Sequence, residues 1–133
     1  MEQKRPLVWL SADSGQNPAP MSLACQWAIV PIDINTQPLA NLPHWRGPAV
    51  GVCVIADLEL AGLPLFGPWL EALPVSSWLA LVRREQLQHP AVRQMIREFC
   101  QDYHTLPIAP YRLSDSLGHM WGMAKLTEAL ASS

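Results

Sequence analysis

The chain of 133 residues has the length of one domain and enough residues to form a sizeable core. Half of its residues are hydrophobic and only 15% are charged, which argues against an intrinsically disordered protein. The formal net charge of −2 argues against a general nucleic-acid surface, and no apolar run reaches the ~18–20 residues of a membrane-spanning helix. We therefore expect a folded cytoplasmic domain that neither binds DNA directly nor contacts a membrane.

Strands and helices alternate along the chain. The predicted elements are, in chain order, strand 7–10, short helix 21–27, strand 28–34, strand 50–55, short helix 64–73, strand 78–82, helix 90–100, strand 103–106 and helix 111–130. The runs at 50–55 and 78–82 are apolar throughout, which is typical of strands buried on both faces of a parallel sheet. Pro31 favours an edge position for its strand, because proline has no backbone N–H to donate to a neighbour.

This alternation predicts an α/β three-layer sandwich, in which helices cover both faces of a five-stranded parallel sheet. The expected strand order is 2-1-3-4-5, as in flavodoxin. Residues 1–133 are expected to form one domain, with a linker helix starting at about 125–133. Ligands of such sheets bind at the carboxyl ends of the strands. The residues predicted at that edge are Ser11, Ala12, Asp13, Asp57, Val82, Arg83 and Leu106.

The segment 102–107, with the sequence DYHTLP, resembles the last strand of receiver domains, where Asp-Tyr-x-x-Lys-Pro is usual. The resemblance implies an acidic pair that helps to hold magnesium, an aspartate that accepts a phosphoryl group, and a hydroxyl and a lysine that bind its oxygens. It also implies a cis peptide bond before Pro107, which costs an X-Pro bond little.

Aligned with receivers, the chain retains only part of this chemistry. Asp57 matches the phosphoacceptor, and Asp13 lies one place beyond the position of the acidic pair. Val82 stands at the position of the hydroxyl residue and Leu106 at that of the lysine. A phosphoryl group on Asp57 would therefore have too few compensating charges. We expect a degenerate phosphoacceptor pocket with no catalytic residue, no metal ion and no other cofactor.

The carboxyl-terminal third resembles the amino-terminal domain of VpsR-type sigma-54-dependent transcriptional activators. The resemblance rests on residues 102–107, on Arg112-Leu113 and on residues 117–124, LGHMWGMA. Those activators join a degenerate receiver-like domain to an AAA+ ATPase and a helix-turn-helix domain, and they control exopolysaccharide and biofilm genes. The resemblance implies that this chain is a non-catalytic regulatory and dimerisation domain. Its implied partners are a second copy, the downstream ATPase domain and sigma-54 RNA polymerase.

In this family, two copies would pair through the surface of the fourth helix, fifth strand and fifth helix. Tyr103 matches the aromatic switch position of receivers, and Leu117, Met120 and Trp121 form an apolar ridge on the last predicted helix. We expect these four residues to form the switch and dimer surface. The alternative for the ridge is packing onto the sheet.

Two other functions stay open. One is a phosphorylatable receiver that uses Asp57 and Asp13. The other is a sensor of cyclic di-GMP, to which several family members respond and for which Arg83, Arg84, Arg93 and Arg97 offer cations. An enzyme is disfavoured, because no nucleophile–base pair or Gly-rich phosphate loop is evident.

Cysteines and tryptophans give two smaller predictions. The three cysteines are expected to be buried, reduced thiols, because their spacing fits neither a metal site nor a redox motif. Trp9 and Trp78 fall in predicted strands and are expected in the core. Trp45, Trp69 and Trp121 are candidates for exposed contact residues.

Overall fold

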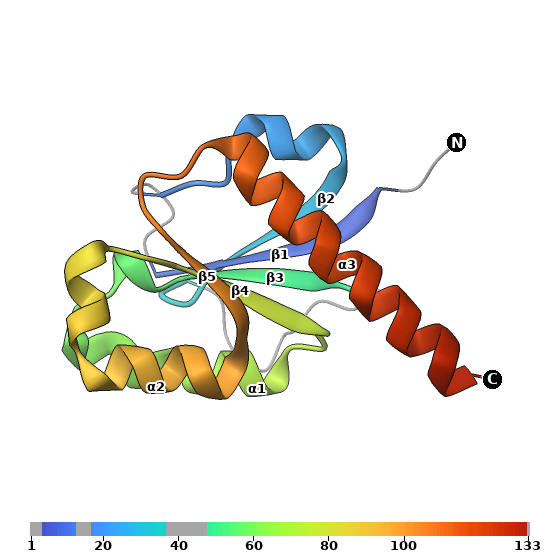
Figure 1. The fold of residues 1–133 in the computed structure, drawn as a ribbon. Coiled ribbons are helices and arrows are strands. Elements are labelled where there is room, and N and C mark those ends of the chain that lie inside the picture. Colours follow the sequence, from blue (N-terminus) through green and yellow to red (C-terminus); the bar gives the residue numbers. More distant parts are fainter. Residues whose placement is uncertain (1–3, 13–16, 37–47, 133) are drawn as a thin grey trace.

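The fold is a five-stranded parallel sheet between two helical layers (Figure 1). The computed structural model describes residues 4–12, 17–36 and 48–132. The strands are β1 (Arg5–Ser11), β2 (Trp27–Asp33), β3 (Val50–Val54), β4 (Ser77–Val82) and β5 (Cys100–Thr105). Their order in the sheet is β2-β1-β3-β4-β5, and each neighbouring pair is parallel. The predicted fold class and strand order are confirmed.

The position of each strand follows from its sequence. β3 is buried along its whole length and β4 along all but its first residue, as their uninterrupted apolar runs predict. β2 lies at one edge of the sheet and pairs only with β1, so Pro31 needs no second strand as a partner. β5 lies at the opposite edge, and three of its six residues are exposed.

Helices cover both faces of the sheet. α3 (Pro110–Ser132) and the 3₁₀ helix η1 (Met21–Cys25) lie on one face, and α1 (Gly67–Ala72) and α2 (Pro90–Phe99) lie on the other (Figure 1). Three further 3₁₀ helices are η2 (Ile55–Asp57), η3 (Leu60–Leu65) and η4 (Arg84–Gln88). The predicted helix at 64–73 is thus divided between η3 and α1.

A separate apolar core fills each side of the sheet. Trp78 belongs to the core under α1 and α2, and Trp9 to the core under α3, so both are buried as predicted. Trp69, which we expected to be exposed, is only 6% exposed. The expectation was wrong because α1 turns this side chain toward the sheet, where it packs in the first core. Trp45 lies outside the described residues.

α3 has a buried half and an exposed half. Leu113, Leu117 and Met120 recur at helical spacing and pack on the sheet, so each is almost completely buried. Beyond them, Met123, Leu126 and Leu130 are 50%, 53% and 67% exposed. The carboxyl-terminal end of the helix extends past the sheet (Figure 1).

A stack of cations and indoles joins α3 to the start of the sheet. The Arg5 guanidinium carbon lies 3.9 Å from the ring centroid of Trp27 and 5.2 Å from that of Trp121. The Lys125 ammonium nitrogen lies 5.0 Å from the Trp121 ring. Gly118 faces the same guanidinium, 3.9 Å from the place where a Cβ would lie. Cation–π attraction therefore joins β1 and β2 to α3.

The three thiols differ in exposure. Cys25 is exposed, Cys53 is buried and Cys100 is half-buried, so the prediction of buried cysteines is confirmed for Cys53, holds in part for Cys100 and is wrong for Cys25. Cys25 ends the short helix η1, and its side chain faces outward. The sulfurs of Cys53 and Cys100 lie 3.8 Å apart. All three are free thiols, as predicted.

Candidate functional site

A cavity opens at the carboxyl ends of the strands, where the α/β fold predicts a ligand site. Its volume is about 550 Å³. The connections that follow β1, β3, β4 and β5 all contribute to its walls. The lining residues are Asn17, Ala56, Asp57, Glu59, Arg83, Leu106, Pro107 and Ile108.

Asp57 is the carboxylate that sequence analysis places at this edge. It ends η2, the tight turn directly after β3, and lines the cavity. The side-chain amide of Asn17 donates a hydrogen bond of 2.6 Å to its Oδ1. The indole of Trp9 in turn donates to the backbone oxygen of Asn17 at 3.1 Å, which holds Asn17 beside the carboxylate. Asp57, which follows β3, is therefore held by a residue that follows β1 and lies 40 residues away along the chain.

Leu106 lies where receiver chemistry needs a lysine. It follows β5, it is half-buried, and it lines the same cavity as Asp57. Its backbone N–H donates to the Val82 oxygen at 2.8 Å, so the β5 exit is anchored to the end of β4. The next bond, Leu106–Pro107, is cis, as predicted. This part of the cavity wall is apolar and cannot neutralise an anion on Asp57.

Val82 does not belong to the cavity. Its side chain is completely buried in the core under α1 and α2, because Val82 ends β4 on the face of the sheet that these helices cover. The prediction that Val82 lines the degenerate pocket is therefore wrong. Position 82 still offers no hydroxyl to a phosphoryl group. Arg83, the next residue, turns to the other side and lines the cavity instead.

Arg83 brings a positive charge to the cavity wall. Its guanidinium donates to the Leu58 oxygen at 3.3 Å and lies 3.6 Å from the Glu85 carboxylate. The side chain is 41% exposed, so the ion pair with Glu85 is largely screened by water. Arg83 is thus partly exposed to solvent and also anchored to the turn after β3. Arg84 is exposed and does not line the cavity.

The oxygen ligands of a magnesium site are incomplete among the described residues. Ser11 and Ala12, at the predicted position of the acidic pair, are buried and carry no carboxylate. Asp13 lies outside the described residues. In the described part of the chain, no three His, Cys, Asp or Glu side chains are grouped as metal ligands would be. Among the described residues, the carboxylates that line the cavity are Asp57 and Glu59.

Sequence analysis missed Asn17 and Glu59. The loop rich in Ser, Gly, Asn and Pro after the first strand had to reach this edge of the sheet, since every β1 exit does in a parallel fold. Its position after the first strand predicted which edge of the sheet it reaches, but did not show which of its residues would contact Asp57. Glu59 lies only two residues beyond Asp57, so it follows the same strand end and could have been predicted at the same edge of the sheet.

Two of the four residues predicted for the dimer surface are core residues. Leu117 and Met120 are 0% and 3% exposed and pack on the sheet, so their side chains cannot meet a second copy. Trp121 is half-buried under Arg5. Tyr103, on the edge strand β5, is 45% exposed. The correction has a simple cause: the last helix has apolar residues on two faces, and spacing alone did not show which face meets the sheet.

Comparison with known proteins identifies the family. The model of the VpsR domain matches residues 3–118. The chain belongs to the VpsR domain family. This confirms the resemblance that the carboxyl-terminal third predicted. A search of curated proteins gave no match.

The fold of this VpsR domain has a similar solved structure, the crystal structure of adenylate cyclase from Rhodopirellula baltica. The TM-score is 0.73, and the match covers 98% of the VpsR domain and 96% of the other chain. Only 13% of the residues are identical, so the comparison supports the fold alone. In the described part of the VpsR domain, no helix is both long and apolar enough to span a bilayer.

Proposed function

We propose that this VpsR domain is a non-catalytic regulatory and dimerisation domain of a sigma-54-dependent transcriptional activator. Its receiver pocket would be degenerate, and its output would concern exopolysaccharide and biofilm genes. The observation that carries the proposal is the place of Leu106, which lines the cavity beside Asp57 where a receiver has its lysine. Membership of the VpsR domain family supports a regulatory role and gives no support to catalysis.

Regulation without phosphoryl transfer follows from the charges of the cavity. A phosphoryl group on Asp57 would add negative charge next to Glu59, which lines the same wall. Arg83 is the described cation there, and Leu58 and Glu85 already engage its guanidinium. Stabilising an additional anion needs donors or cations directed at it. The domain would therefore act through contacts with other proteins.

Pairing would use the β5 edge of the sheet and the exposed half of α3. Met123, Leu126 and Leu130 recur at three and four residue steps, so they form one apolar stripe on the helix. Tyr103 adds an exposed aromatic ring on β5. A stripe of this kind is stabilised when it packs on an equivalent stripe of a second copy. These residues replace Leu117 and Met120 in the proposed surface.

Sedimentation of matched leucine variants tests the pairing. Leu126→Asp and Leu130→Asp each remove an apolar contact of about 1.5–3 kcal/mol if the stripe is buried in a dimer, so each should weaken self-association at least tenfold. Leu65→Asp is the control, because Leu65 is 57% exposed and lies in η3 on the opposite face of the sheet. Equal association of all variants and the wild type would remove the pairing proposal.

A phosphorylatable receiver is the second candidate, since Asp57 lines an open cavity that also contains Arg83. A phosphodonor separates the two candidates, because only this one requires covalent modification of Asp57. A cyclic di-GMP sensor has less support: of its four candidate arginines, Arg83 alone lines the cavity. Calorimetry with cyclic di-GMP tests that sensor, and binding heat that Arg83→Ala abolishes would favour it.

A further inference from the structure

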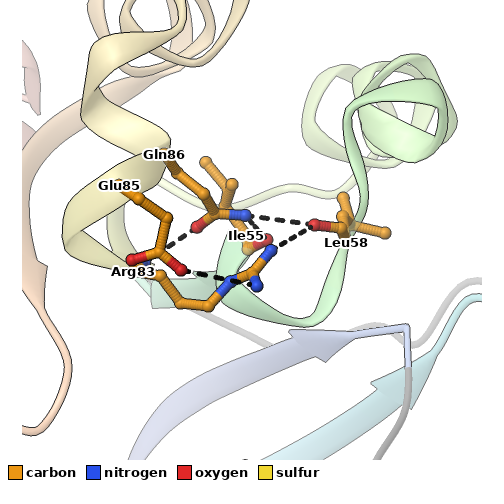
Figure 2. A network of polar contacts seen from close by, with 5 residues as sticks. All are labelled: Ile55, Leu58, Arg83, Glu85 and Gln86. Atoms are coloured by element: carbon orange, nitrogen blue, oxygen red, sulfur yellow. Dashed lines mark hydrogen bonds and ion pairs between the residues drawn. The ribbon is translucent and has the colours of Figure 1, made fainter.

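Gln86 is a polar side chain in an apolar place. It lies in η4, directly after β4, and is only 5% exposed. Its side-chain nitrogen donates to the backbone oxygens of Ile55 and Leu58, each at 3.1 Å. Its side-chain oxygen accepts from the backbone N–H of Arg83 at 2.8 Å. Figure 2 shows these contacts with the Arg83 guanidinium, which reaches the same Leu58 oxygen. We call Ile55, Leu58, Arg83 and Gln86 the Gln86 network.

The chemistry of the network fixes its arrangement. Two carbonyl oxygens face one end of the Gln86 amide and a backbone N–H faces the other, so only one orientation of the amide satisfies all three. Both polar ends of the buried Gln86 amide are then paired, as buried polar groups usually are. A shorter or apolar side chain at this position would leave the Arg83 N–H without this acceptor and each of the two oxygens with one hydrogen bond fewer.

The two oxygens lie on either side of Asp57 in the chain. Ile55 begins η2 and Leu58 follows Asp57 directly, so Gln86 holds the backbone before and after the carboxylate. Gln86 itself lies in the connection between β4 and α2, and the His89 oxygen accepts the first hydrogen bonds of that helix. The network thus links the Asp57 turn to the start of α2.

We propose that the Gln86 network keeps the exits of β3 and β4 in one fixed arrangement without any ligand, and that Gln86 is the positioning residue for Asp57. This inference deepens the proposed function, because protein atoms then supply a connection that a phosphoryl group would make in a receiver. Val82, at the end of β4, has no hydroxyl for that purpose. Four residues further along, Gln86 reaches the β3 turn instead.

Backbone hydrogen exchange on two charge-matched variants tests the proposal. Gln86→Glu keeps the oxygen that accepts from Arg83 but replaces the donating nitrogen, so it should break the contacts with the β3 turn selectively. The Leu58 amide, which donates to the Ile55 oxygen, should then exchange about tenfold faster or more. Gln88→Glu makes the same change at an exposed position of the same 3₁₀ helix and should leave this amide unchanged. Amides in the middle of β3 are the internal reference for global unfolding.

The positions at which exchange becomes faster show whether Gln86 links the β3 turn to η4 or only supports η4 itself. Faster exchange at Leu58 together with unchanged β3 amides supports the link. An effect confined to residues 84–89, or no effect, overturns it. Gln86→Met, which removes both polar atoms, must give the same result at Leu58. If neither variant folds, the wild type in mild denaturant decides: the Leu58 and His89 amides must open with the same free energy, and separate opening overturns the proposal.

The outcome is distinguishable from a failure of the proposed function. The exchange pattern of the Gln86 network does not depend on whether two copies pair or whether Asp57 accepts a phosphoryl group. Unchanged exchange in Gln86→Glu would contradict the network alone, and equal association of the leucine variants would contradict the pairing alone.

Discussion

Gly51 offers a quantitative test of how β3 and β4 pack. Gly51 and Trp78 are paired residues of these strands, and the indole lies across the glycine. A Cβ at position 51 would lie 2.4 Å and 2.5 Å from two ring carbons of Trp78. Carbon atoms normally approach to about 3.5–4.0 Å, so the overlap exceeds about 1 Å. The ring is only 3% exposed and has little room to move.

We therefore expect Gly51→Ala to lower the free energy of unfolding by about 1–3 kcal/mol, the usual cost of overpacking a core. For a domain of this size the midpoint of thermal unfolding should fall by about 5–10 °C. Gly122→Ala is the matched control. An added Cβ there meets no atom within 4 Å, and alanine is favoured over glycine inside a helix by about 1 kcal/mol. That variant should be more stable than the wild type.

Calorimetry of the two variants and a rescue variant completes the test. Trp78→Leu alone should destabilise the domain by creating a cavity. Combined with Gly51→Ala, it should cost less than the sum of the two separate effects, because the ring that the methyl group overlaps is gone. If Gly51→Ala unfolds at the wild-type temperature, or if the two effects simply add, the described contact between β3 and β4 is wrong.

Two further predictions concern stability and thiol chemistry. Arg5→Met removes the cation from between Trp27 and Trp121 and should lower the free energy of unfolding in urea by about 1–2 kcal/mol, with Arg5→Lys intermediate; an unchanged midpoint would contradict the stack. In alkylation followed by mass spectrometry, the exposed Cys25 should react before the buried Cys53. A hydrogen bond with Cys100 and then burial raise the pKa of Cys53 and so disfavour its reactive thiolate; equal rates would refute this. The raised pKa of Cys53 favours the neutral thiol in the folded state. Its contribution to the free energy of unfolding is therefore complete below about pH 8.5 and is lost as the pH rises further. Cys53→Ala should reduce this loss of stability at high pH.

The fold could be predicted from sequence because its signals are local. The apolar runs of β3 and β4 can be buried only in the centre of a sheet, and Pro31 favours an edge for its strand. Strands separated by helices then require parallel pairing and leave few possible topologies. The cis bond before Pro107 followed from a resemblance in the strand just before it.

The site was only partly predictable, because its contacts join distant parts of the chain. Asp57 and Leu106 were found from the ends of their strands, which share one edge of the sheet. The hydrogen bond from Asn17 to Asp57 spans 40 residues and leaves no periodic signal. Gln86 was missed for another reason: polar residues are usually exposed, and only the structure shows the two backbone oxygens that make its burial favourable.

The direction in which the last helix faces was also beyond the sequence. Leu117 and Met123 are both apolar and lie six residues apart, on different faces of α3. The sheet packs against the face of Leu117 and leaves Met123 half exposed. Helical spacing shows that both faces exist, but the choice between them depends on how the connection after β5 directs α3 across the sheet.

Mass spectrometry of the intact domain after incubation with acetyl phosphate and magnesium tests the central claim most directly. With Leu106 beside Asp57 and no lysine at that position, we expect no mass increase and no change in self-association, under conditions that modify a phosphorylatable receiver. A mass increase of one phosphoryl group that is present in the wild type and absent in Asp57→Ala would contradict the account.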